Sequence, residues 1–166
     1  MSIIELMIAM VVLTVGVLGC MSLIITAIAT NGRNRYQSSS TTVAQMVTEK
    51  ILSVPANTSP TLSFMDCSGT AQNINTTGSA TGAGATPLLP SGDVNFSLAA
   101  VTGYSMLYTT CGTAGRQVVY DVRWNIKTLS PYSKLITVSA KLQGTGTDAK
   151  LIAFPVTIRS LAGQGS

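Results

Sequence analysis

The chain has 166 residues, no His, only 10% charged residues and a net charge of +4. This length suffices for one helix-anchored domain, and the charged fraction lies well below the quarter typical of soluble domains. General acid–base catalysis favours His or paired carboxylates, so the composition disfavours an enzyme and favours an exported structural protein without a cofactor or metal. The positive charge lies mostly after Gly115, without interleaved aromatic residues, and supports nucleic-acid binding only weakly.

Residues 1–32 form an apolar segment with a single charged side chain, Glu5. Roughly 20 apolar residues cross a bilayer, and the run from Ile3 to Ala29 is longer than that. A lone carboxylate in such a helix is costly unless it meets a positive partner. The nearest positive group of fixed position is an α-amino group at Met1, of the same chain or of a neighbouring copy shifted along the axis. We therefore expect Glu5 to set the register between subunits.

A secretory signal peptide begins with basic residues and ends in a small-residue cleavage site, and this segment does neither. We therefore expect Met1 to be the first residue of a processed chain. The segment Met1–Leu13, MSIIELMIAMVVL, resembles the mature N-terminus of type IV pilins and pseudopilins. In that family a basic leader is removed, the new first residue is N-methylated, and a glutamate stands at the fifth place. The resemblance thus implies N-methylation of Met1 and an assembly role for Glu5.

Two further segments, Leu13–Gly19 and Ala44–Ile51, resemble PilV-type minor pilins more weakly. The resemblance covers about the first 54 residues. It implies a structural subunit of a type IV pilus that supports motility, adhesion or DNA uptake, made in the inner membrane and then displayed outside the bacterial cell. It also implies association with other pilin subunits, a prepilin peptidase, an assembly ATPase and a membrane platform. A pseudopilin of type II secretion and a membrane-tethered binding protein that never polymerises stay as alternatives.

The helix is expected to continue beyond the membrane, over residues 33–54. The polar joint Asn31–Arg35 could end it, but apolar residues then recur at helical spacing until Pro55 stops the helix. This stripe contains Val43, Met46, Val47, Lys50, Ile51 and Val54. Within the apolar half, Gly16 and Gly19 each cost roughly 1 kcal/mol against Ala. They indicate either close packing between helices or a segment that melts on assembly.

The cysteines divide by their surroundings. Cys20 lies in the apolar segment and is expected to pack as a small hydrophobe, whereas Cys67 and Cys111 lie in polar sequence. In an oxidising compartment Cys67 and Cys111 would pair. Arg33 and Arg35 follow the apolar segment, and the positive-inside rule alone would place the head in the cytoplasm. The expected basic leader and the expected disulfide both favour the head outside.

Residues 55–115 are expected to be a Ser/Thr/Gly-rich region, with a long loop over 68–93 and short strands at Val94–Leu98 and Tyr104–Thr109. Residues 116–166 alternate apolar and polar side chains, which predicts an antiparallel meander with its apolar face against the helix stripe. The predicted strands are 118–127, 135–142 and 151–158, the last at an edge because of Pro155. Trp124 is expected in the core. The fold class is therefore α+β, with a long N-terminal helix on a C-terminal antiparallel sheet.

Overall fold

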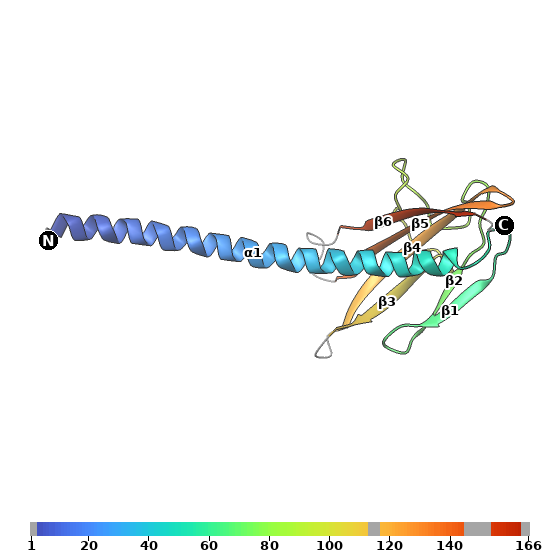
Figure 1. Cartoon of the computed structure of the whole chain (residues 1–166), viewed down its shortest axis with the longest axis horizontal. Helices are drawn as coiled ribbons and strands as arrows, with labels where there is room; N and C mark the ends of the chain where they lie inside the picture. The colour runs from blue at the N-terminus through green and yellow to red at the C-terminus, as the bar shows by residue number, and fades with distance from the viewer. Residues whose placement is uncertain (1–2, 113–116, 145–153, 164–166) are drawn as a thin grey trace. The chain divides into compact units, whose positions relative to one another are not determined.

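The computed structural model describes residues 3–112, 117–144 and 154–163. It confirms an α+β fold, with one long N-terminal helix and antiparallel strands that follow it (Figure 1). The chain divides into two compact units, residues 1–35 and residues 36–166. The first unit is helical throughout its described part, and the second holds the rest of the helix and all the strands.

Helix α1 runs from Ile3 to Leu52. The polar joint Asn31–Arg35 does not end it, because the only strong helix breaker in this part of the chain is Pro55. The helix closes two residues before the predicted end, with Ser53 N donating to Glu49 O at 2.9 Å and Val54 N to Ile51 O at 3.3 Å.

Within the second unit, one side of α1 is buried against the sheet. Val43, Val47 and Ile51 of the predicted stripe are buried, whereas Lys50 is exposed. The buried side of the helix differs from the predicted stripe, because it also contains the smaller residues Ser40, Ala44 and Thr48. The hydroxyls of Ser40 and Thr48 donate to the carbonyls of Tyr36 and Ala44 one turn earlier, so their burial leaves no donor unpaired. Small side chains here let the helix backbone approach the strands.

Four antiparallel strands form the main sheet, in the order β3-β4-β5-β6. Their bounds are Ser105–Cys111, Gln117–Ser130, Ser133–Leu142 and Val156–Gly163. The predicted meander is thus confirmed. The short strand predicted at Tyr104–Thr109 is also confirmed, as β3, and it joins the meander as a fourth strand. The last strand, β6, begins directly after Pro155 and lies at an edge, as predicted, but it extends beyond the predicted end at Ile158. Its predicted first residues, 151–153, lie outside the described residues.

The core lies between α1 and one face of this sheet. Tyr120, Val122, Trp124 and Ile126 of β4 are at most 1% exposed, and the β5 partners of the last three, Ala140, Val138 and Ile136, are fully buried. Trp124 is a core residue, as predicted, and its indole Nε1 donates to Asn75 O at 3.0 Å. The alternation of β4 therefore points its apolar set at the helix.

The region between the helix and the meander holds more structure than predicted. A hairpin of β1, Thr61–Met65, and β2, Ala71–Asn75, stands where part of a loop was expected. Its inward side chains include Ile74, which is fully buried, and Leu62 and Phe64, which pack against the core. The prediction of a strand at Val94–Leu98 is wrong, because Val94 makes only an isolated bridge to Leu88.

The long loop after β2 is fastened to β4 through backbone and amide groups. Ser79 N donates to Ile126 O, and Thr128 N donates to Ser79 O. Asn125 Nδ2 donates to Gly82 O at 3.0 Å and to Thr86 O at 2.8 Å. Gly82 has φ +75°, and a Cβ there would lie 2.7 Å from Asn125 Oδ1. A loop poor in large apolar residues is thus ordered by hydrogen bonds.

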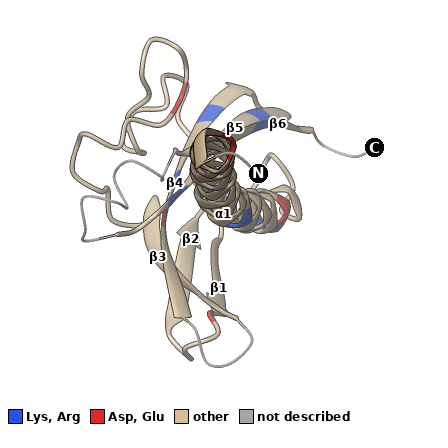
Figure 2. Cartoon of the chain, turned by 90° about the vertical axis from the view of Figure 1, so that its left-hand side faces the viewer, with Lys and Arg blue, Asp and Glu red and all other residues tan. Residues whose placement is uncertain are grey.

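Two basic side chains of the sheet are buried. Arg123 is 8% exposed and forms an ion pair of 2.8 Å with Asp121. Lys134 is 7% exposed, and its Nζ donates to Thr58 O at 2.7 Å, to Ser59 Oγ and to Thr76 O. Burial lowers the pKa of Lys134. Basic positions on β4, β5 and β6 are marked in Figure 2; Arg116 and Lys150 lie outside the described residues.

Candidate assembly helix

The described part of the first unit presents apolar side chains on every side. Each Ile, Leu, Val and Met from Ile3 to Ile28 is exposed, from 47% at Val17 to 83% at Ile3. Full burial of one such side chain contributes about 1.5–3 kcal/mol. A helix that is apolar all round is normally buried in protein or in a membrane. This segment is therefore built to be covered by lipid or by other chains.

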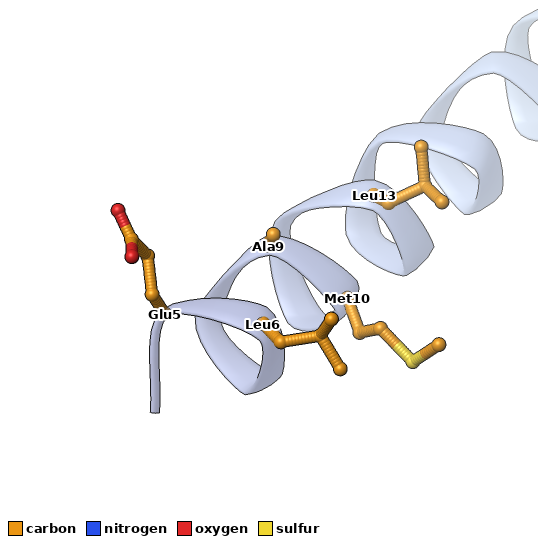
Figure 3. Close-up of a pocket in the computed structure, with 5 residues that line it drawn as sticks. All are labelled: Glu5, Leu6, Ala9, Met10 and Leu13. Carbon is orange, nitrogen blue, oxygen red and sulfur yellow. The ribbon is translucent and has the colours of Figure 1, made fainter. Parts of the chain in front are cut away.

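Glu5 is the one charged side chain in the first turns of this helix. Figure 3 shows its carboxylate extending away from the helix, beside a shallow concavity lined by Leu6, Ala9, Met10 and Leu13. Among the described residues, Glu5 has no hydrogen-bond or ion-pair partner. An acidic group in the first turn interacts favourably with the helix dipole, but an apolar surrounding would still require a cation nearby. Met1, its predicted partner, lies outside the described residues.

Two of the hydroxyls in the apolar segment bond within the helix. Thr14 Oγ1 donates to the carbonyls of Met10 and Val11, and Thr26 Oγ1 donates to Ser22 O at 2.9 Å. Polar groups in a hydrocarbon environment need such internal partners. The segment can therefore enter an apolar environment with Thr14 and Thr26 already paired.

Gly16 and Gly19 lie in the middle of the apolar segment. A Cβ at either position would meet nothing within 4 Å, so no contact within the described chain requires glycine there. Close packing between helices and melting on assembly both stay as predictions. Cys20, beside them, is a free and exposed cysteine. At about 1.5 Å per residue, Glu5 is about 16 Å from Gly16 along the helix, so the two do not form one site.

A disulfide joins Cys67 and Cys111, as predicted, with their Cα atoms 5.8 Å apart. It ties the turn between β1 and β2 to the end of β3. The neighbouring carboxylate, Asp66, accepts hydrogen bonds from Ser68 Oγ at 2.6 Å and from the backbone N of Ser68 and Thr70. The Ser68 hydroxyl contributes most to lowering the pKa of Asp66 from 3.8 to about 2, and desolvation opposes the shift. Nothing in the sequence indicated this network.

The hairpin also makes contacts with the backbone of β3. Gln72 Nε2 donates to Leu107 O at 3.0 Å, and Thr109 N donates to Asp66 Oδ2 at 3.4 Å. These two contacts attach β2 and the β1–β2 turn to alternate residues of β3. The Asp66 carboxylate is thus a structural group that holds the hairpin, the disulfide and β3 together.

Comparisons with family models, with curated proteins and with solved structures find no match to this chain. By length and composition, α1 is able to cross a membrane, and it is the one such helix among the described residues. In the described ranges, no three His, Cys, Asp or Glu side chains are grouped so that they could hold a metal ion.

Proposed function

We propose that this chain is a structural subunit of a filament of the type IV pilus kind. The observation that carries the proposal is the combination of a helix exposed on all its apolar sides and one carboxylate, Glu5, near its start. The resemblance of Met1–Leu13 to pilin N-termini supports the same proposal. The apolar segment would be held in a membrane before assembly. It would then be covered again by the equivalent helices of neighbouring subunits.

The proposed partner of Glu5 is the α-amino group of a neighbouring copy, with a methylated Met1 as the first residue of the mature chain. Pairing with a cation offsets the cost of placing a carboxylate in an apolar core. A shift of one copy along the helix axis would change the distance between the Glu5 carboxylate and the neighbour's α-amino group. The ion pair would therefore select one register between neighbouring subunits. The folded second unit, with its disulfide, would form the outer surface of the filament.

The machinery proposed for this subunit comprises a prepilin peptidase, an assembly ATPase and a membrane platform, and the finished filament would lie outside the cell. A pseudopilin of type II secretion would use the same helix. A tethered protein that never polymerises would also use it as an anchor. These alternatives differ from the proposal in whether this chain repeats along a surface filament.

Electron cryo-microscopy of sheared surface filaments, with mass spectrometry of the same material, tests the proposal. We expect this chain to repeat along the filament, to begin at a methylated Met1, and to place Glu5 beside a neighbour's amine. Absence of the chain from filaments would contradict its role as a filament subunit. A different first residue in the mature protein would contradict the proposed processing at Met1. A trace amount beside another dominant subunit would assign it a minor role.

Glu5→Ala separates assembly from membrane insertion. The variant keeps every large apolar side chain, so we expect it in the membrane fraction at the level of the unchanged protein. We expect at least a tenfold loss of filaments, because each subunit interface loses its register-setting pair. The matched control is Glu49→Ala, which removes the other glutamate of the chain from an exposed site on α1 in the second unit. Filaments of Glu5→Ala at normal abundance would refute the pairing.

A further inference from the structure

Three segments of the second unit have the form Asn-x-Ser/Thr, the acceptor sequence for N-linked sugar. Their asparagines are Asn57, Asn75 and Asn95. The sugar is attached to the Asn side chain, and the sequence also requires the hydroxyl two residues later. Each segment can therefore be judged by whether its amide and hydroxyl are free and whether its backbone is accessible.

The first two segments are held by contacts with the folded interior. In the first, Ser59 Oγ accepts a hydrogen bond from the buried Lys134 Nζ at 3.1 Å. In the second, Asn75 ends β2, where its backbone N donates to Gly103 O and its carbonyl accepts from Trp124 Nε1. A transferase could engage either segment only by breaking these contacts.

The third segment, Asn95–Ser97, lies on the surface. Asn95 is half-buried, and residues 97–100 are all exposed. Ser97 N donates to Asn95 Oδ1 at 2.9 Å and closes a turn between the two residues. In the described part of the chain, neither Asn95 Nδ2 nor Ser97 Oγ has a hydrogen-bond partner. The amide and the hydroxyl of this segment are thus both free.

Contacts on either side hold this turn in place. Asp93 forms an ion pair of 3.1 Å with Arg159, and both side chains are about half exposed. After the turn, Arg123 Nη1 donates to Leu98 O at 2.7 Å, and the guanidinium lies 5.0 Å from the Phe96 ring centroid. A turn that is already formed lowers the ordering cost of binding. The segment is therefore displayed in one conformation to a modifying enzyme.

Only the third segment has an acidic residue two positions before its asparagine. Asp93 stands there, whereas Pro55 and Asn73 stand at the equivalent places of the other two. Exposed ion pairs contribute little, so the Asp93 carboxylate can exchange Arg159 for a cation of a transferase. The pattern Asp-x-Asn-x-Ser thus offers an enzyme a charged group in addition to the amide and the hydroxyl.

We propose that Asn95 is the acceptor of an N-linked glycan, donated from an oligosaccharide that is bound through C1 to a polyprenyl diphosphate. Asn95 Nδ2 forms a bond to that C1, and the bond between C1 and the diphosphate oxygen breaks. The diphosphate leaves with the electron pair, and Nδ2 releases one proton to a base of the transferase. This inference goes beyond the proposed function and does not rest on filament assembly.

Mass spectrometry of the full chain, isolated from the cells that make it, tests the proposal. After reduction of the disulfide, trypsin and Asp-N protease place the three asparagines in separate peptides, 51–65, 66–92 and 93–116. Electron-transfer dissociation then assigns any sugar to a single residue. We expect a glycan on Asn95 and none on Asn57 or Asn75.

Variants separate N-linked transfer from other modifications. Asn95→Gln and Ser97→Ala should each lower glycan occupancy at least about twentyfold, whereas Ser97→Thr keeps the hydroxyl and should retain most of it. Asp93→Asn should lower occupancy at least about fivefold, because it removes the charge. The matched control is Asn57→Gln, at an exposed asparagine, which should change nothing. Trp124 fluorescence during denaturant unfolding verifies that each variant is folded.

The outcomes distinguish this inference from the filament role. An unmodified peptide 93–116 would overturn it, and so would a sugar that survives Asn95→Gln, because that sugar would be attached elsewhere. Loss of the sugar in Asn95→Gln and Ser97→Ala, but not in Asn57→Gln, would establish it. Filaments built from unmodified subunits would contradict this inference alone, and a glycosylated chain that is absent from filaments would contradict the proposed function alone.

Discussion

The two units of this chain use apolar residues in opposite ways. In the second unit, apolar side chains of α1, β4 and β5 are buried, and polar side chains that share the interior have hydrogen-bond partners. In the first unit, a longer run of apolar side chains is exposed along the helix. The second unit is thus stabilised by its own contacts, whereas the first requires contacts from outside the chain. The same residue type should therefore matter differently in the two units.

Truncation of one isoleucine in each unit tests this contrast most strongly. Ile126→Ala removes a side chain that is fully buried, and we expect it to lower the free energy of unfolding of the second unit by as much as about 5 kcal/mol. Ile24→Ala, at a position that is 58% exposed, should change it by less than about 0.5 kcal/mol. Denaturant unfolding of the full chain in detergent, followed by Trp124 fluorescence, measures both. Equal losses would abolish the distinction between the units.

The cysteines allow the same comparison with a covalent bond. Replacing Cys67 and Cys111 with Ser opens a loop of sequence separation 44, and we expect a loss of about 3–4 kcal/mol in the second unit. Cys20→Ser should leave the unfolding midpoint unchanged, because that thiol is free and exposed. The same fluorescence titration checks both variants. A double Ser variant with an unchanged midpoint would show that the hairpin is held to β3 by hydrogen bonds alone.

Two glycines should respond to alanine with opposite signs. Gly82→Ala places a Cβ 2.7 Å from Asn125 Oδ1 at a positive φ, and we expect a loss of about 1–3 kcal/mol in the second unit. Gly16→Ala meets open space and should favour the helix by about 1 kcal/mol. Circular dichroism in detergent measures the second effect, with Gly19→Ala as a companion. Reduced helicity in Gly16→Ala would contradict it.

The smallest expected effect is a pH dependence confined to the second unit. Because folding lowers the pKa of Asp66 from 3.8 to about 2, the unfolded chain binds more protons between these values. The contribution of Asp66 is therefore complete above about pH 4 and is lost as the pH falls toward 2. Unfolding midpoints measured from pH 5 to pH 2 should fall less steeply in Asp66→Asn. A variant that follows the slope of the unchanged protein would remove Asp66 as the cause.

Much of this architecture follows from periodicity. Helical spacing predicted the buried Val43, Val47 and Ile51, and two-residue alternation predicted β4, β5 and the buried Trp124. The β1–β2 hairpin was missed because its strands are short and partly made of Thr, Ser, Asn and Gln. The attachment of the predicted loop to Asn125 was missed for a similar reason, since hydrogen bonds to the backbone leave no hydropathy pattern. Burial of Lys134 depends on carbonyls from distant parts of the chain.

The candidate assembly residues were selected from the sequence, since no contact within the described chain distinguishes them. Glu5 was noted because it interrupts an apolar run, and Gly16 and Gly19 because glycine is costly in a helix. Their predicted roles concern neighbouring molecules, and a single chain supplies none. The Cys67–Cys111 pair, by contrast, is formed within one chain. The Asp66 network beside it required the structure, because its donors come from two segments that are distant in the sequence, residues 68–72 and Thr109 of β3.

The contacts of Gln72 with Leu107 O and of Asp66 with Thr109 N affect how readily the protein can aggregate through β3. β3 is an edge strand, and exposed edges recruit strands from other molecules into aggregates. At alternate positions of β3, side chains of the hairpin already occupy a carbonyl and an amide that an incoming strand would need. At high protein concentration, strand pairing between molecules at the β3 edge is thereby hindered. Solubility of the second unit at high concentration is thus protected by two side chains that add nothing to its apolar core.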